Sequence, residues 1–129
     1  MSIYLDSSAA LKLVFNEGES RALQRYLGQR PKLSSSSLLR SELVRAVYRL
    51  DPRQLGRARR VLSHFDTRDI DSEILDRAGE IAPRSLRTLD AIHIATATLL
   101  GPDLAALVTY DRRMIEAAHL YGLPVASPA

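Results

Sequence analysis

Short apolar runs alternate along this chain with longer segments in which apolar residues recur every three or four positions. The runs are too short for helices and are bounded by turn residues, which is typical of buried strands. They predict strands over 3–5, 106–110 and 123–127, another within 32–37, and a brief extended piece over 67–70.

The periodic segments predict amphipathic helices, because a 3.6-residue period places the apolar positions on one side. Thr88 stands where the sixth helix would begin, and Gly122 follows the last one in the position that favours glycine. The predicted helices cover 7–15, 19–30, 37–50, 52–65, 71–82, 88–100 and 112–121.

Strands that alternate with helices, and that are apolar throughout rather than at every second position, favour a parallel sheet covered on both faces. The fold class is therefore α/β with a central, mainly parallel sheet. The chain has no internal repeat, low-complexity tract or linker, so we expect one domain over residues 1–129.

Composition agrees with such a domain. The chain has 129 residues, of which 46% are hydrophobic and 26% charged, close to the average of soluble globular domains. The absence of cysteine excludes disulfides, thiolate nucleophiles and cysteine-bound metal sites. No basic-then-apolar leader and no apolar stretch of membrane-spanning length occurs, so we expect a cytoplasmic protein with no membrane partner.

Positive charge is concentrated in one segment. The formal net charge is +3, yet residues 40–60 carry seven arginines against two acids. Guanidinium groups bind phosphate well, which makes Arg45, Arg49 and Arg53 candidates for contacts with a polyanion. The alternative is that these arginines form the solvated face of two amphipathic helices.

Asp90 is the least expected acid, because the 88–100 helix is apolar on nearly every side. With Thr88 as the cap, Asp90 is the second helical residue, where the helix dipole favours an anion by about 0.3–1 kcal/mol. Removing an unpaired carboxylate from water costs several kcal/mol. The dipole alone is therefore a weak reason to keep this residue.

Three other acids occupy related places. Asp6 and Asp111 follow predicted strands and precede helices, where each could serve as an N-cap. Glu42 lies at the border of an apolar stripe, where a pair with Arg45 or Arg49 is the ordinary expectation. In an open parallel sheet, however, ligands bind at the carboxyl ends of the strands. The four acids converge there if each helix also begins at that edge.

Converging carboxylates raise one another's pKa unless a cation lies between them. Oxygen ligands without cysteine or paired histidine favour Mg²⁺ or Mn²⁺ over zinc. Such an ion can acidify a water molecule and clamp a phosphate oxygen, so the chemistry indicated is phosphodiester hydrolysis.

With these residues in place, the chain resembles the PIN-domain ribonucleases, and most closely the VapC toxins of bacterial type II toxin–antitoxin pairs. The segments that carry the resemblance span the chain and keep their order: IYLDSSA, SELVRAV, LDAIHIATA and LVTYD. Each segment alone is weakly specific, and the four together are strongly so. The acidic positions show no departure from the family pattern.

The resemblance implies a three-layer α/β/α fold and Mg²⁺-dependent endoribonuclease activity that inhibits translation or growth. Asp6 and Asp90 would bind the metal directly, whereas Glu42 and Asp111 would do so directly or through water and orient the attacking water. It also implies a homodimer, a VapB-type antitoxin that places a basic side chain among the acids, and a larger toxin–antitoxin assembly. Arg45, Arg49 and Arg53 would then contact RNA.

Three further residues stand beside the acids. Ser8 and Thr109 match hydroxyl positions of the family, although helix capping and a strand-end hydrogen bond explain them equally well. His93 shares a helix face with Asp90 and could support the carboxylates, but a hydrogen-bonded core histidine is the more ordinary interpretation.

A different class of function is an RNA-binding protein that inhibits growth by occupancy, without catalysis. Aromatic residues make up only 5% of the chain and do not interleave with basic ones, which argues against a single-strand stacking surface. A phosphatase or phosphoreceiver would favour DxD after the first strand, where this chain has DSS.

Overall fold

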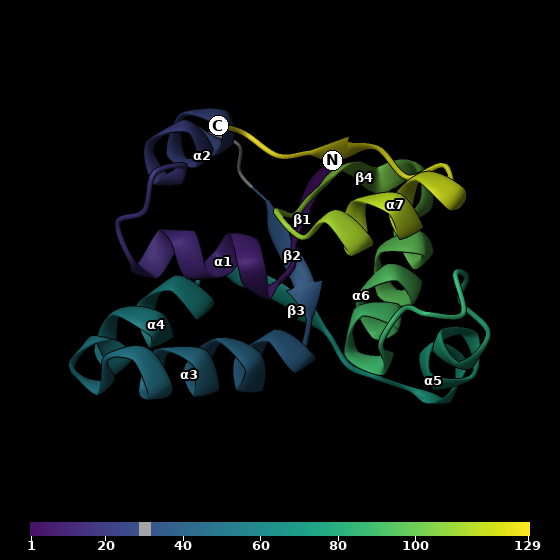
Figure 1. The fold of residues 1–129 in the computed structure, drawn as a ribbon, viewed down its shortest axis with the longest axis horizontal. Coiled ribbons are helices and arrows are strands. Elements are labelled where there is room, and N and C mark those ends of the chain that lie inside the picture. Colours follow the sequence, from purple (N-terminus) through teal and green to yellow (C-terminus); the bar gives the residue numbers. More distant parts are fainter. Residues whose placement is uncertain (29–31) are drawn as a thin grey trace.

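Five parallel strands form one sheet in the order β3-β2-β1-β4-β5 (Figure 1). The structure is a computed structural model that describes residues 1–28 and 32–129. The strands are β1 Ser2–Leu5, β2 Leu33–Ser36, β3 Phe65–Arg68, β4 Leu104–Val108 and β5 Val125–Ala126.

Helices connect the strands on both sides of the sheet. Two short 3₁₀ turns, Pro52–Gln54 and Gly101–Asp103, precede α4 and β4. The α-helices are α1 Ser7–Val14, α2 Ser20–Leu27, α3 Leu38–Leu50, α4 Leu55–Leu62, α5 Ser72–Gly79, α6 Thr88–Leu99 and α7 Arg112–Leu120.

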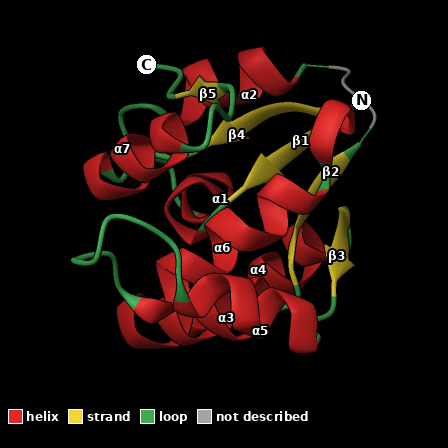
Figure 2. Cartoon of the chain, turned by 90° about the vertical axis from the view of Figure 1, so that its right-hand side faces the viewer, coloured by secondary structure: helices red, strands yellow, loops and turns green. Residues whose placement is uncertain are grey.

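The central strand β1 is buried on both faces, which explains its continuous apolar pattern. Ile3 and Leu5 point to one face and pack with α1 and α2, while Tyr4 points to the other and packs with α6 and α7. The sheet is therefore the middle of three layers (Figure 2). The predicted α/β/α fold class is confirmed, and every strand pair in the described residues is parallel.

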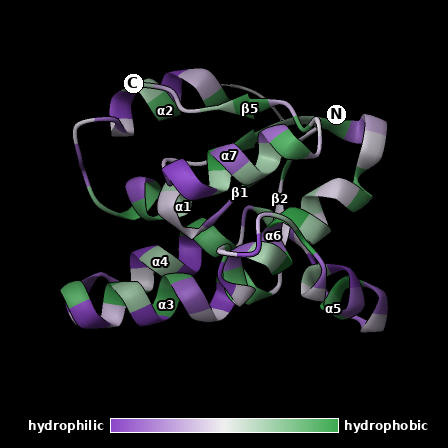
Figure 3. Ribbon diagram, turned by 45° about the vertical axis from the view of Figure 1, so that its right-hand side comes forward, coloured by the Kyte–Doolittle hydropathy of each residue, from purple (hydrophilic) through white to green (hydrophobic). Residues whose placement is uncertain are grey.

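Helix α3 lies outside the sheet, against α1 and α4. Its buried residues Leu39, Leu43 and Val47 form one stripe that contacts Ala10 and Val14 of α1. The rest of its surface carries arginines together with the exposed Tyr48 and Leu50, and Figure 3 shows hydrophilic and hydrophobic residues alternating along this helix. This packing places the arginine-rich helix against the second half of α1.

The strand order creates a crevice between β1 and β4. The chain moves outward from β1 to β2 and β3, then returns to place β4 on the other side of β1. At such a topological switch point the connections leave the carboxyl ends of the strands in opposite directions, so the end of the sheet stays open. Asp6 directly follows β1, and Thr109 directly follows β4.

Several predicted bounds are wrong by a few residues. The helix predicted over 52–65 is a 3₁₀ turn followed by α4, because Pro52 starts the turn capped by Asp51. Strand β3 lies two residues before the predicted piece, since only alternate residues of this edge strand are partly buried and its apolar signal is weak. The predicted strand 106–110 is β4, which begins and ends two residues earlier and leaves Asp111 three residues past it. The end of the helix predicted over 19–30 lies outside the described residues.

No helix in the described chain is long and apolar enough to cross a membrane.

Candidate active site

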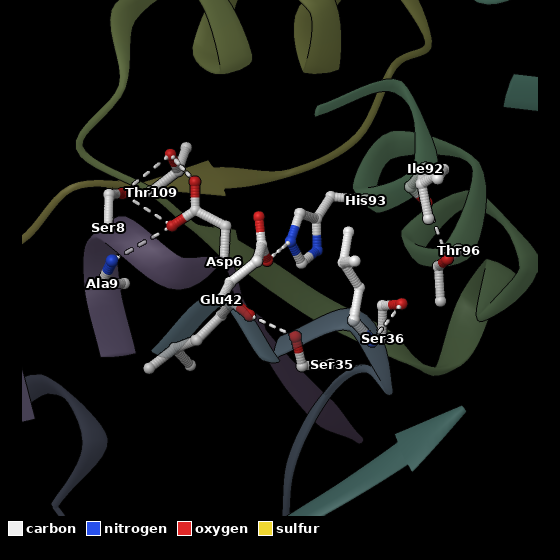
Figure 4. Close-up of polar contacts among 12 residues, drawn as sticks. Asp6, Ser8, Ala9, Ser35, Ser36, Glu42, Ile92, His93, Thr96 and Thr109 are labelled. Carbon is white, nitrogen blue, oxygen red and sulfur yellow. Dashed lines mark hydrogen bonds and ion pairs between the residues drawn. The ribbon is translucent and has the colours of Figure 1, made fainter. Parts of the chain in front are cut away.

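Asp6 lies buried at the carboxyl end of β1, with 2% of its surface exposed. The Oδ1 atom accepts hydrogen bonds from the Ser8 hydroxyl (2.6 Å) and the Ala9 amide (3.1 Å). The Oδ2 atom accepts one from the Thr109 hydroxyl at 2.5 Å. Figure 4 shows this carboxylate between the two hydroxyl groups. The side chain therefore caps α1 and is at the same time fixed from β4.

Burial raises the pKa of Asp6, and the hydrogen bonds from Ser8 and Thr109 oppose that rise. The two hydroxyls also accept backbone N–H groups, Ser8 from Tyr110 and Thr109 from Asp111. Each hydroxyl therefore accepts an amide just past β4 and donates to the Asp6 carboxylate. The side-chain caps of α1 and α7 are Asp6 and Asp111 instead.

Asp111 is the N-cap of α7, and its Oδ1 atom accepts the Arg113 amide at 2.9 Å. Asp90 lies in the first turn of α6, but Arg87 rather than Thr88 is the N-cap, so Asp90 is the third helical residue and not the second. Extended backbone at Arg87 sets this helix start, and no side chain caps it. Within residues 1–28 and 32–129 the Asp90 carboxylate accepts no hydrogen bond.

The pKa of Asp90 is raised, first by burial and then by the negative charge of Asp111, with smaller contributions from Asp6 and Glu42. His93 opposes the rise. Each of the other three predicted acids is therefore close enough to affect the pKa of Asp90. The four acids are up to 105 positions apart in the sequence, and the structure brings them together at the carboxyl ends of the strands.

Glu42 does not pair with Arg45 or Arg49. Its Oε1 atom lies 2.6 Å from Nε2 of His93, whose Nδ1 lies 2.7 Å from the Tyr4 hydroxyl (Figure 4 shows the first contact). The Tyr4 oxygen in turn accepts the Ser36 amide at 3.1 Å. His93 is thus both the hydrogen-bonded core residue and a support of a candidate acid.

The contacts leave neither ring nitrogen of His93 without a partner, since Nε2 faces Glu42 and Nδ1 faces the Tyr4 hydroxyl. Burial raises the pKa of the Tyr4 phenol far above its usual value, so the phenol is neutral. The sequence analysis missed Tyr4 because it stands in an apolar strand, although a buried phenol usually has a partner.

Comparison with known proteins places these residues in a family. The PIN domain model matches residues 3–120. Ribonuclease VapC46 of Mycobacterium tuberculosis is 50% identical over 130 residues, covering 99% of this chain and 98% of that protein. The chain belongs to the VapC ribonucleases of the PIN-domain family. The resemblance predicted from the four sequence segments is confirmed.

Solved structures support the fold of this PIN domain. A toxin–antitoxin complex from Klebsiella pneumoniae contains a chain with a TM-score of 0.73 and 24% identity, with 98% of each chain covered. Mycobacterium tuberculosis VapC20, described as a Sarcin-Ricin loop cleaving toxin, gives a TM-score of 0.74 at 16% identity, covering 89% of this chain and 94% of that one.

The three candidate arginines of the PIN domain differ in surroundings. Arg45 and Arg49 line a hollow on α3 together with Glu42. Arg53 instead forms an ion pair with Asp51 at 3.0 Å beyond the end of that helix. The charge of Arg53 is therefore already partly balanced, whereas Arg45 and Arg49 line the hollow with Glu42 and form no ion pair with the described residues.

The acids offer the oxygen donors that Mg²⁺ prefers. Among the described residues, no three His, Asp or Glu side chains are arranged to enclose a metal ion. Mg²⁺ sites commonly use only one or two carboxylates and complete the octahedron with water and substrate phosphate. Hydrogen bonds orient both carboxylate oxygens of Asp6, and no described residue donates a hydrogen bond to the carboxylate of Asp90. These two carboxylates are therefore suited to such an open site.

Proposed function

We propose that this PIN domain is the toxin of a type II toxin–antitoxin pair that hydrolyses RNA phosphodiester bonds with Mg²⁺, for which Mn²⁺ substitutes. The observation that supports the proposal best is the Asp6 carboxylate, held by Ser8 and Thr109 at the end of β1. Beside it, the pKa of Asp90 is raised by burial and then by the charges of Asp111, Asp6 and Glu42. Four clustered carboxylates repel one another, and a divalent cation removes that repulsion. The related VapC46 carries the name ribonuclease.

Asp6 and Asp90 would hold the ion directly, and Glu42 and Asp111 directly or through water. When bound, Mg²⁺ supplies an acidified water and a clamp on a phosphate oxygen. Ser8 and Thr109 hold the Asp6 carboxylate at the end of β1. The hydrogen bond with His93 fixes one oxygen of Glu42, so the other is available to orient the attacking water.

We also propose a VapB-type antitoxin as partner, and the similar chain from Klebsiella pneumoniae was solved in a toxin–antitoxin complex. A basic side chain of the antitoxin placed among the acids would balance their charge and block the approach of phosphate. The protein would act in the cytoplasm as a homodimer and join a larger assembly with its antitoxin.

The test is controlled expression in bacteria, with growth followed and new RNA 5′ ends mapped. We expect the wild type to arrest growth and to create defined 5′ ends, and Asp90→Ala to do neither. Asp103→Ala is the matched control, because Asp103 is an exposed acid just before β4, at the opposite edge of the sheet.

Inhibition by occupancy gives a different result. Asp90→Ala would then still arrest growth without new 5′ ends, and reversal of the charges of Arg45, Arg49 and Arg53 would abolish the arrest. That pair of results would contradict the proposed ribonuclease.

A further inference from the structure

A hollow of about 430 Å³ lies directly beside the candidate active site. This volume falls within the range of pockets that hold small ligands, roughly 300–1,000 Å³. It extends from the start of α1 along α3, where its lining runs from Glu42 to Arg49. Its lining residues are Ser7, Glu42, Arg45, Ala46, Tyr48 and Arg49.

The hollow meets the acidic cluster at Glu42, which lines the hollow and is one of the four acids. Ser7, which also lines it, directly follows Asp6 in the sequence. A molecule bound in the hollow therefore reaches the cluster at Glu42.

Two arginines give the hollow its positive charge. Arg45 and Arg49 are exposed, and in the described part of the chain neither forms an ion pair or hydrogen bond. They stand three and seven residues after Glu42, which places the three side chains on one face of α3. At 1.5 Å per residue, they follow Glu42 by about 4.5 and 10.5 Å along the helix axis. A polyanion that starts at the acids and runs along α3 would meet one guanidinium after the other.

Tyr48 adds an unpaired aromatic ring to this charged wall. Its side chain is 57% exposed, and among residues 1–28 and 32–129 it has no hydrogen-bond, ring or cation partner. An exposed ring that lines the same hollow as two free guanidinium groups is suited to stack a nucleobase while the arginines bind phosphates. Base stacking of this kind needs a nucleotide that is not already stacked in a duplex.

We propose that this hollow is a subsite for one unstacked nucleotide of the RNA strand, next to the phosphate at the acids, with its base on Tyr48 and neighbouring phosphates on Arg45 and Arg49. The subsite rests on the proposed ribonuclease function and adds the residues that would bind the nucleotide beside the cleaved bond. Tyr48 acts here as a binding residue and has no part in the chemistry of the acids.

Binding without cleavage tests the subsite. The full chain is mixed in EDTA with a short single-stranded oligoribonucleotide that carries 2-aminopurine, and affinity is measured by anisotropy and stacking by fluorescence quenching. We expect Tyr48→Ala to weaken binding by about 5- to 150-fold and to lose the quenching. Tyr48→Phe keeps the ring and should bind within about twofold of the wild type, and the matching duplex should show no dependence on Tyr48.

The arginines are tested by salt dependence. Replacing Arg45 or Arg49 with glutamine should reduce the slope of log K against log salt by about 0.7 each, because one phosphate contact is lost. Leu50→Ala is the control for exposed apolar surface, since Leu50 lies on the same helix with the same 57% exposure. Arg25→Gln, on α2 far from α3 (Figure 1), is the control for total charge and should change neither affinity nor slope.

Unchanged affinity and quenching in Tyr48→Ala would overturn the subsite. It is equally wrong if Tyr48→Ala and Leu50→Ala both change the sedimentation mass while RNA affinity stays constant, because the surface is then a protein interface. Cleavage of RNA by the wild type in Mg²⁺ is measured separately. Its absence would contradict the proposed function, whereas a failed binding test with intact cleavage would contradict the subsite alone.

Discussion

Single side chains at this site have two duties that sequence analysis treats as alternatives. Asp6 and Asp111 cap α1 and α7, and both also belong to the acidic cluster. Their context after strands was enough to predict their positions. Tyr4 could not be found in the same way, because its partner His93 is 89 residues away and nothing local links the two.

Asp90→Asn should keep or raise the stability of the metal-free protein. The raised pKa of Asp90 means that the folded state is penalised when this group is ionised, so the penalty is present at neutral pH and disappears as the pH falls through its folded-state value towards 3.8. Thermal unfolding in EDTA measures this. The variant should have a Tm at or above that of the wild type at pH 7, with the difference closing near pH 4, and a clearly lower Tm at pH 7 would contradict it.

Tyr4→Phe should destabilise the fold by about 1–3 kcal/mol, because it leaves the buried Ser36 amide and Nδ1 of His93 without a partner. Tyr110→Phe is the comparison, since its hydroxyl donates a single bond to the Pro128 carbonyl near the surface. That change should cost only about 0.5–1.5 kcal/mol. Urea unfolding of both variants gives the two values, and a Tyr4→Phe protein as stable as the wild type would rule out the hydrogen-bond chain.

Helices and strands were predictable in number and order, because the 3.6-residue and continuous apolar patterns differ clearly. Where an element begins and ends was less predictable when tertiary contacts determine it. Strand β3, for example, pairs with β2 although its alternate residues are exposed. The direction of each helix was also hidden in the sequence. Both α6 and α7 begin at the end of the sheet where β1 finishes. The starts of these helices therefore bring Asp90 and Asp111 to Asp6.

Substitutions at the start of α7 separate capping from chemistry. Asp111→Ser keeps a side chain that can accept the Arg113 amide, whereas Asp111→Ala loses the cap and should cost about 0.5–2 kcal/mol. Both remove the carboxylate and should lose RNA cleavage alike. Unfolding and cleavage assays on the two proteins check this, and full activity in the stable Asp111→Ser protein would show that Asp111 is only a cap.

At the scale of the whole molecule, the carboxyl end of the sheet is open, and positive and negative side chains lie in separate places beside it. The parallel architecture followed from the sequence, but the order β3-β2-β1-β4-β5 did not, because connections of similar length allow β4 to join either edge. That order places the end of β1 beside the end of β4 and so creates the crevice. The arginine-rich α3 lies next to it and offers a positive surface beside a negative site.

The most direct test of this account is the rate at which the purified protein cleaves RNA under single-turnover conditions, measured in Mg²⁺ and in EDTA for the wild type, Asp90→Asn and the control Asp103→Asn. We predict cleavage by the wild type and the control only in Mg²⁺, and a loss of about 100-fold or more in Asp90→Asn. Equal cleavage in EDTA, or by folded Asp90→Asn, would contradict a metal-dependent ribonuclease built on these four carboxylates.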